Sequence, residues 1–226
     1  DISSNVLLND LNCSFNQITT LPGLPNSITN IRCSYNQLAS LPSLPNNLLV
    51  LTCSGNQLTS LPALSISLNQ LECDNNQLTN IPILPNGIQI INCSYNLINN
   101  LPPLPNGLGG LICSNNQLNN LQILPSTIVS LDCSHNNINC FAPFNNIMYF
   151  IISNNPFTCL PNYIPAMDAS TLNYPLCAMG NVNGCPDANG IVGFTYKDNN
   201  INCAKDSGDL ALKNIPLQIY DNAGTL

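Results

Sequence analysis

Charged side chains are scarce in this sequence. Of 226 residues, 4 are Lys or Arg and 11 are Asp or Glu, so charged residues make up 7% of the chain and the formal net charge is −7. An ordinary soluble domain carries roughly 25% charged residues. Nucleic acids and anionic membranes bind clustered basic residues, so this composition argues against both as partners.

Long apolar runs are also missing. Hydrophobic residues make up 44% of the chain, enough for a sizeable core. No run approaches the ~20 apolar residues that a membrane-spanning helix needs, so we expect no membrane span. The sequence begins at Asp1 with no initiator methionine and no secretion signal. We interpret it as a mature or trimmed piece of a longer secreted precursor.

The sequence does contain a strict 20-residue repeat, which uses many of its 41 asparagines. The frame L-x-x-L-x-C-x-x-N-x-L fits from Leu8 to about Pro161, and the last unit, from Ile147, is degenerate. Repeats of this length are typical of solenoids. The cysteine of the frame recurs one unit apart at Cys13, Cys33, Cys53, Cys73, Cys93, Cys113 and Cys133.

Each unit predicts one short strand followed by an extended arm. The alternation around Leu51 and Cys53 places both side chains on the inner side of a strand. The segment LPxLP then returns the chain, and its prolines exclude a helix. Stacked units would bury the apolar edges that no single unit can bury. We therefore predict a solenoid with a parallel sheet on its concave face, extended or turn-like convex arms and little helix.

The asparagine of the frame has a predicted structural role. Backbone groups lose their ladder partners where each strand turns away, and a buried amide can donate and accept hydrogen bonds at once. We expect a ladder of buried amides that belongs to the scaffold. Its members are Asn16, Asn36, Asn56, Asn76, Asn96, Asn116, Asn136 and Asn155.

These motifs resemble bacterial leucine-rich repeats that carry LPxLP, as in effector proteins of enteric pathogens. The resemblance is closer still to the Asn- and Cys-rich solenoids of secreted Bacteroidota proteins. It covers residues 1–177, about eight units, with the C-terminal cap beginning near residue 140. It implies the fold and a location outside the cell or on the outer surface of a bacterium. It does not specify a function, because function depends on sites placed on a fold.

The twelve cysteines fall into two groups. The seven ladder cysteines face inward, and we expect free buried thiols there rather than a metal-binding ladder. Cys140 and Cys159 occupy the same polar edge position in successive units, so we predict that they form a disulfide. Cys177 and Cys185 flank a loop that a second disulfide could close, and Cys203 has no evident partner. Disulfides would support secretion.

A second module is predicted after the linker 178–187. Residues 190–198 and 215–226 are typical of strands, and the segment between them has the oxygen-ligand spacing of a calcium-binding loop. A plain Asn/Asp-rich turn is the alternative. Cys203 stands where such loops have Gly, and the last ligand is Asp rather than Glu. The predicted ligands are Asp198, Asn200, Asn202, the Ala204 carbonyl, Asp206 and Asp209.

Residues 188–226 resemble the opening of the B-type module of bacterial serine-aspartate-repeat surface proteins. That module is a small calcium-binding β-sandwich of the collagen-adhesin B-repeat kind. The resemblance implies a structural calcium ion at the loop just described. A sandwich needs about seven strands and two are evident, so we interpret the module as incomplete.

Catalysis has little support in the sequence. His135 follows Ser134, but serine recurs at that position in other units without histidine. Glu72 and Asp74 lie two residues apart on one strand, ~6.6 Å between Cα atoms, on an open face with no sign of a pocket that would raise a carboxyl pKa. We therefore predict that the protein is not an enzyme.

Binding is the favoured function, because solenoids often bind along their exposed sheet face. We expect a protein or glycan ligand, as in adhesion. The alternative is a structural subunit of an extracellular filament: residues 1–7 align with a returning arm, which leaves a solenoid edge that a second copy could cover. The predicted ligand-binding residues are Asn12, Arg32, Thr52, Glu72, Asn92 and Asp132, with the flanking Tyr35 and Tyr95.

Overall fold

A computed structural model describes residues 2–144, 147–162, 164–168, 170–175 and 177, and the short strands 196–197 and 210–211. The chain divides into two compact units, residues 1–188 and residues 189–226. We describe each unit by itself.

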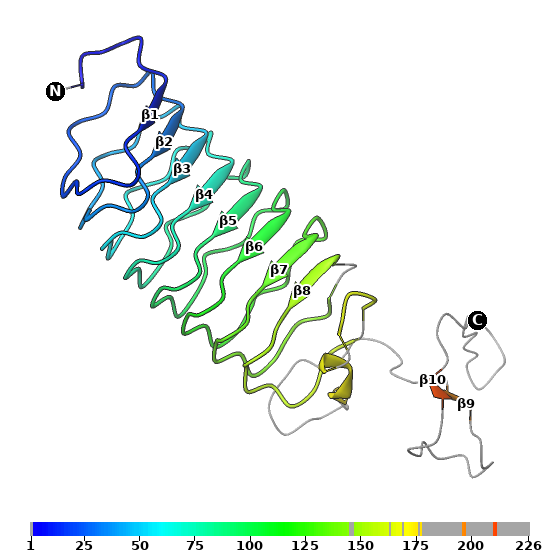
Figure 1. The fold of residues 1–226 in the computed structure, drawn as a ribbon. Coiled ribbons are helices and arrows are strands. Elements are labelled where there is room, and N and C mark those ends of the chain that lie inside the picture. The colour runs from blue at the N-terminus through cyan, green and yellow to red at the C-terminus, as the bar shows by residue number, and fades with distance from the viewer. Residues whose placement is uncertain are drawn as a thin grey trace. The chain divides into compact units, whose positions relative to one another are not determined.

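The first unit is built on a parallel sheet of eight three-residue strands that follow one another in chain order (Figure 1). Seven successive steps join neighbouring strands, and six of them are 20 residues long; the last, from Leu131 to Phe150, is one residue shorter. The strands are β1 Asp10–Asn12, β2 Asn30–Arg32, β3 Val50–Thr52, β4 Gln70–Glu72, β5 Ile90–Asn92, β6 Gly110–Ile112, β7 Ser130–Asp132 and β8 Tyr149–Ile151.

The middle residue of each strand faces the core, and its two neighbours face the other way. Leu51 and Leu71 have no exposed surface, while Val50 and Thr52 on either side are half-buried. The backbone ladder continues beyond each strand, since the Cys53 N–H donates to the carbonyl of Glu72 at 2.8 Å. Because alternate residues of a strand point to opposite sides, each strand has one side buried in the core and one face open to solvent.

The returning arms contain no helix. Each LPxLP segment is extended and ends in a turn, such as the one in which the Ile88 N–H donates to the carbonyl of Pro85 at 3.2 Å. The one helical element of the described residues is the single turn η1, Thr171–Asn173. The predicted leucine-rich-repeat solenoid, with a parallel sheet and almost no helix, is therefore confirmed for the first unit. No helix within the described ranges is long and apolar enough to cross a membrane.

The predicted asparagine ladder is confirmed from Asn36 to Asn155, whereas Asn16 is exposed and its side chain donates only within its own repeat. The Asn96 amide donates to the carbonyls of Cys73, Cys93 and Ser94, each at 3.1 Å. Its Oδ1 accepts the N–H of Leu78 at 2.9 Å. One buried side chain thus forms hydrogen bonds with its own repeat and with the repeat before it. The same pattern recurs in every repeat that has a preceding one.

The ladder cysteines are free thiols, as predicted. Cys33, Cys53, Cys73, Cys93, Cys113 and Cys133 are buried, and Cys13 in the first strand is partly buried. Desolvation raises the pKa of the thiols of Cys33 and Cys93 to about 12, with a smaller contribution from Cys13 at Cys33 and from Asp74 at Cys93. Thiols with such a raised pKa are packing residues rather than nucleophiles.

The predicted disulfide pairing is wrong. Cys159 is bonded to Cys177, so neither the predicted Cys140–Cys159 bond nor the predicted Cys177–Cys185 bond forms. The reason lies in the backbone: the Leu160 N–H donates to Pro175 at 2.9 Å and the Cys177 N–H donates to Leu160 at 2.8 Å. The chain after η1 therefore returns alongside Leu160 and brings Cys177 next to Cys159. Cys140 is disulfide-bonded as well.

Aromatic rings close this end of the solenoid. Phe141 contacts Phe144 and Phe157, with ring centroids 5.2 and 5.1 Å apart, and Phe157 contacts Tyr174 at 4.5 Å. Phe144 also packs edge-on against Phe150 of β8 at 4.8 Å. Together these rings form one aromatic cluster that includes Phe150 of β8.

The second unit is described at two short strands. β9, Tyr196–Lys197, pairs antiparallel with β10, Leu210–Ala211. β9 falls within the predicted strand 190–198. The six predicted calcium ligands, Asp198 to Asp209, lie outside the described residues, as do Cys185 and Cys203. The calcium site and the β-sandwich therefore stay predictions.

Candidate functional site

The predicted ligand-binding strand residues lie in one row across the open face of the sheet. They are the last residues of successive strands and pair in register, so that Thr52 lies between Arg32 and Glu72. Each is at least partly exposed. We call this the central row: Asn12, Arg32, Thr52, Glu72, Asn92, Ile112 and Asp132.

A second row on the same face was missed by the sequence prediction. It consists of the first residue of each strand, and alternation by two would have identified it. Arg32 of the central row forms a salt bridge with Asp10 of the second row at 2.6 Å, and Gln70 donates to Glu72 at 2.7 Å. We call this the outer row: Asp10, Asn30, Val50, Gln70, Ile90, Gly110, Ser130 and Tyr149.

Neutral donors hold the carboxylates of Asp74 and Asp132 on this face. Asp74 accepts hydrogen bonds from the Ser54 hydroxyl at 2.5 Å, from the Asn75 amide at 2.7 Å and from the Asn92 amide at 3.1 Å. Asp132 accepts the Ser134 N–H at 3.0 Å and its hydroxyl at 2.7 Å. Because these donors carry no charge, they orient the carboxylates without neutralising them. Within the described ranges, Arg32–Asp10 is the one salt bridge.

Phe15 and the predicted Tyr35 and Tyr95 flank the face where the chain leaves each strand. These residues have a left-handed backbone, with φ of 58°, 55° and 52°. Phe15 and Tyr35 stack with ring centroids 4.8 Å apart and planes 15° apart, and both are exposed. Gly55 makes room for the stack, because a Cβ at this position would lie 2.7 Å from the Tyr35 ring. Tyr95 is also exposed.

The described residues show no arrangement suited to catalysis. The Ser134 hydroxyl donates to Asp132 rather than to His135, and His135 Nε2 lies 3.0 Å from the amide of Asn154. No cluster of three or more His, Cys, Asp and Glu side chains in the described segments could hold a metal ion. Glu72 and Asp74 stand on the open face, as expected. That the protein is not an enzyme stays a prediction.

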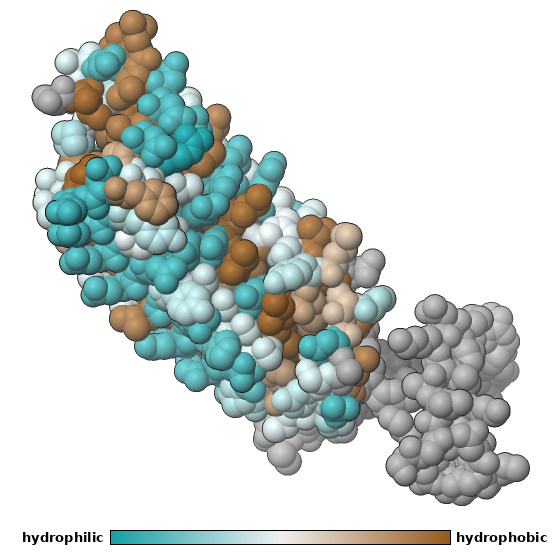
Figure 2. All heavy atoms as spheres, viewed as in Figure 1, coloured by the Kyte–Doolittle hydropathy of each residue, from teal (hydrophilic) through white to brown (hydrophobic). Residues whose placement is uncertain are grey.

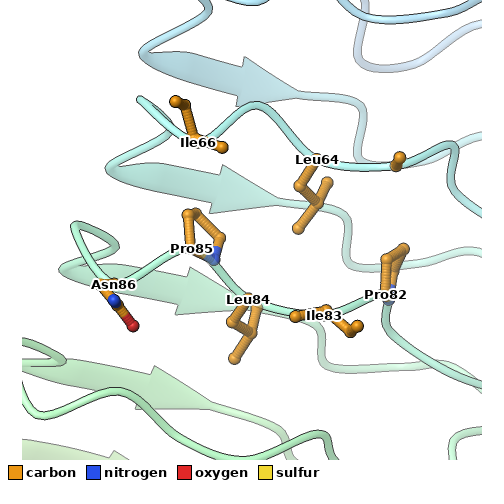
Figure 3. Close-up of a pocket in the computed structure, with 8 residues that line it drawn as sticks. Leu64, Ile66, Pro82, Ile83, Leu84, Pro85 and Asn86 are labelled. Atoms are coloured by element: carbon orange, nitrogen blue, oxygen red, sulfur yellow. The ribbon is translucent and has the colours of Figure 1, made fainter.

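Two hollows of the solenoid lie on the arms, away from the predicted ligand-binding residues. One of about 700 Å³ is lined by apolar side chains from two successive arms, among them Leu64, Ile66 and Ile83 (Figure 3). Ile66 stands where several other arms have asparagine, and it is highly exposed. The hollow offers an apolar surface with few polar groups, so it suits neither catalysis nor a charged ligand.

Comparison with known proteins gives leucine-rich-repeat structures from bacteria. No family model and no curated protein matches the chain. The YopM effector of Yersinia pestis is 32% identical, with a TM-score of 0.66, over 70% of this chain and 46% of that chain. The leucine-rich-repeat domain of a Shigella effector is 31% identical, with a TM-score of 0.59, over 66% of this chain and 70% of that chain.

A third structure shares the cysteine pattern in its description. The functional domain of InlJ from Listeria monocytogenes, described as including a cysteine ladder, is 26% identical over 77% of this chain and 44% of that chain, with a TM-score of 0.54. The chain thus spans less than half of the YopM and InlJ chains. The identity to the Shigella domain, and the share of it that is covered, show that this chain belongs to the bacterial leucine-rich-repeat proteins.

Proposed function

We propose that the solenoid binds a protein partner through the open face of its sheet, outside the cell or on the outer surface of a bacterium. The observation that carries the proposal is the continuity of this face. The central row, the outer row and the exposed rings of Tyr35 and Tyr95 share one solvent-facing side of an eight-stranded sheet. Solenoids use such extended surfaces for binding.

The make-up of the face favours a protein over a small molecule. Exposed tyrosines and an arginine are residue types enriched in protein interfaces. Seven strand spacings of ~4.8 Å give a surface ~34 Å long, and the hollows found on the solenoid lie on the arms instead. A glycan ligand remains the alternative partner.

The related structures support the location and the role. Two of them are described as bacterial effectors and one as the functional domain of a Listeria protein. The Cys159–Cys177 disulfide agrees with an oxidising compartment. Adhesion at the cell surface is the specific form of binding that we propose for this chain.

Alanine replacement on the face tests this function. We expect a variant with Arg32, Glu72, Tyr35 and Tyr95 all replaced by alanine to lose at least about 2 kcal/mol of binding energy, because truncated interface hot spots cost that much. The measurement is the affinity for a partner captured by the wild-type solenoid from the native surface. A control variant carries Thr79→Ala and Asn80→Ala, both exposed beyond the sheet. Equal affinities of the two variants would contradict the proposal.

The predicted end-to-end assembly gains no independent support. Leu11 and Cys13 of the first repeat are partly exposed, whereas Leu51 and Cys53 are wholly buried between neighbouring repeats. A preceding segment of a longer protein would cover this edge as well as a second copy would. The filament therefore stays a prediction.

A further inference from the structure

We propose that the partner presents an extended segment with two basic side chains four residues apart and an apolar side chain midway between them. This segment would lie across β4 to β7 of the open face. The inference rests on the proposed function, since it specifies the partner of the same face.

Two carboxylates mark the ends of this part of the face. Glu72 in β4 and Asp132 in β7 belong to the central row, three strands apart. Glu72 Oε1 accepts a hydrogen bond from Gln70, and Asp132 Oδ1 accepts from Ser134. Both groups are therefore held in place, and no basic side chain of the described solenoid forms a salt bridge with either. A basic partner would supply the missing charge.

The surface between the carboxylates includes apolar side chains beside Asn92. Ile112 of the central row is partly exposed, and Ile90 of the outer row is 45% exposed. Gly110 has no side chain, and a Cβ there would only touch Ile90 at 4.0 Å, so the flank of Ile90 is open. Figure 2 shows apolar side chains gathered over the β5–β7 part of the solenoid among more hydrophilic ones. An apolar partner side chain could be buried here.

The spacing of the strands matches an extended peptide. Three steps of ~4.8 Å place Glu72 and Asp132 ~14 Å apart along the row. An extended chain rises ~3.4 Å per residue and points alternate side chains to one side. Residues i and i+4 then lie ~14 Å apart on the same side, with residue i+2 over the region of Asn92 and Ile112. The two carboxylates and the apolar surface therefore match a Lys-x-Leu-x-Lys pattern.

Charge complementarity selects a basic partner over other occupants. The chain carries a net charge of −7, and Arg32, the cation of this face, is already paired with Asp10. An acidic segment would meet Glu72, Asp74 and Asp132, and the arginine of the described solenoid is already paired with Asp10. A neutral glycan would leave the two carboxylates without a counter-charge.

The test uses a synthetic fluorescent peptide with lysines four residues apart around a leucine, Lys-Ser-Leu-Ser-Lys between glycine-serine flanks. The matched control peptide has the same composition with the lysines three apart, which places them on opposite sides of an extended chain. Fluorescence anisotropy with the full chain measures both affinities. We expect the first peptide to bind at least about fivefold more tightly. Raising the salt from about 0.02 to about 0.15 M should weaken its binding several-fold.

Two substitutions in the protein complete the test. Glu72→Gln and Asp132→Asn should each weaken the first peptide about three- to fivefold, as expected for partly exposed charge pairs. Asp132→Asn should not disturb folding, because Asn92 Oδ1 accepts from Ser94 the same two hydrogen bonds that Asp132 Oδ1 accepts from Ser134. Glu72→Gln keeps an oxygen that can accept the hydrogen bond from Gln70. The inference would be overturned if the two peptides bound equally tightly or if neither bound. It would also be overturned if neither substitution changed the affinity for the first peptide. The proposed function would survive that result if the alanine variant of the face still lost the captured partner.

Discussion

Raising the pH from about 8 to about 10 should strongly destabilise the solenoid. The six buried ladder thiols have an ordinary pKa of 9.0, and burial raises the pKa of Cys33 and Cys93 to about 12. Between these values the unfolded chain releases protons that the folded chain keeps, so stability is complete below pH 9 and falls as the pH rises above it. Each thiol contributes about 1.4 kcal/mol per pH unit, and six contribute about 8. A domain has only about 5–15 kcal/mol in total.

Urea unfolding at a series of pH values between 7 and 10 measures this effect. The loss of stability per pH unit should be smaller by about a third in a variant with Cys73→Ala and Cys93→Ala, because two of six buried thiols are removed. The variant starts from a lower stability at pH 7, so the slopes rather than the midpoints are compared. A flat pH dependence up to pH 10 would show that the ladder thiols are not desolvated as described.

Replacing a ladder asparagine should be the most damaging substitution of a polar residue in the solenoid. Asn96→Ala removes the donor of three hydrogen bonds and the acceptor of a fourth. It leaves the Leu78 N–H without that partner in the core, while the carbonyl of Cys73 keeps its hydrogen bond from the Asn76 amide. An unsatisfied buried polar group costs about 1–3 kcal/mol. We expect Asn96→Ala to lower the free energy of unfolding by about 3–5 kcal/mol in urea titrations at pH 7.

Asn16→Ala is the matched control for this prediction. Asn16 is exposed and donates within its own unit, to the carbonyls of Cys13 and Ser14. Its loss should cost about 1 kcal/mol, as water can replace the missing amide. Equal losses for the two variants would mean that the amide ladder does not couple neighbouring units.

The repeat explains why most of the first unit could be predicted. Each conclusion about Leu51, Cys53 or Asn56 was supported by an aliphatic residue, a cysteine or an asparagine at the same position in at least six other repeats, so strand, buried thiol and amide ladder followed from one frame. The central row followed from the same alternation. The outer row could have been predicted by the same rule. Because it was omitted, the salt bridge between Asp10 and Arg32 was not predicted.

The repeat could not predict what happens where it ends. The partner of Cys159 depends on the chain turning back after Thr171 and pairing with Leu160, a local path that no unit repeats. The stack of Tyr35 on Phe15 depends on Gly55, the one glycine at this position of the repeat. Its role is evident only from the position of the Tyr35 ring, which a Cβ at Gly55 would contact. Likewise, the apolar surface between Glu72 and Asp132 depends on Gly110 leaving Ile90 open.

A comparison of two double-arginine variants tests most directly which side of the solenoid binds. Thr52→Arg with Ile112→Arg places two bulky cations on the open face of the sheet, and Ile66→Arg with Ile83→Arg places the same two on the exposed arms. The measurement is the affinity of each folded variant for a partner captured by the wild-type solenoid. We predict that the sheet variant loses binding and that the arm variant keeps it. Loss of binding by the arm variant, with the sheet variant unaffected, would contradict the proposed binding face.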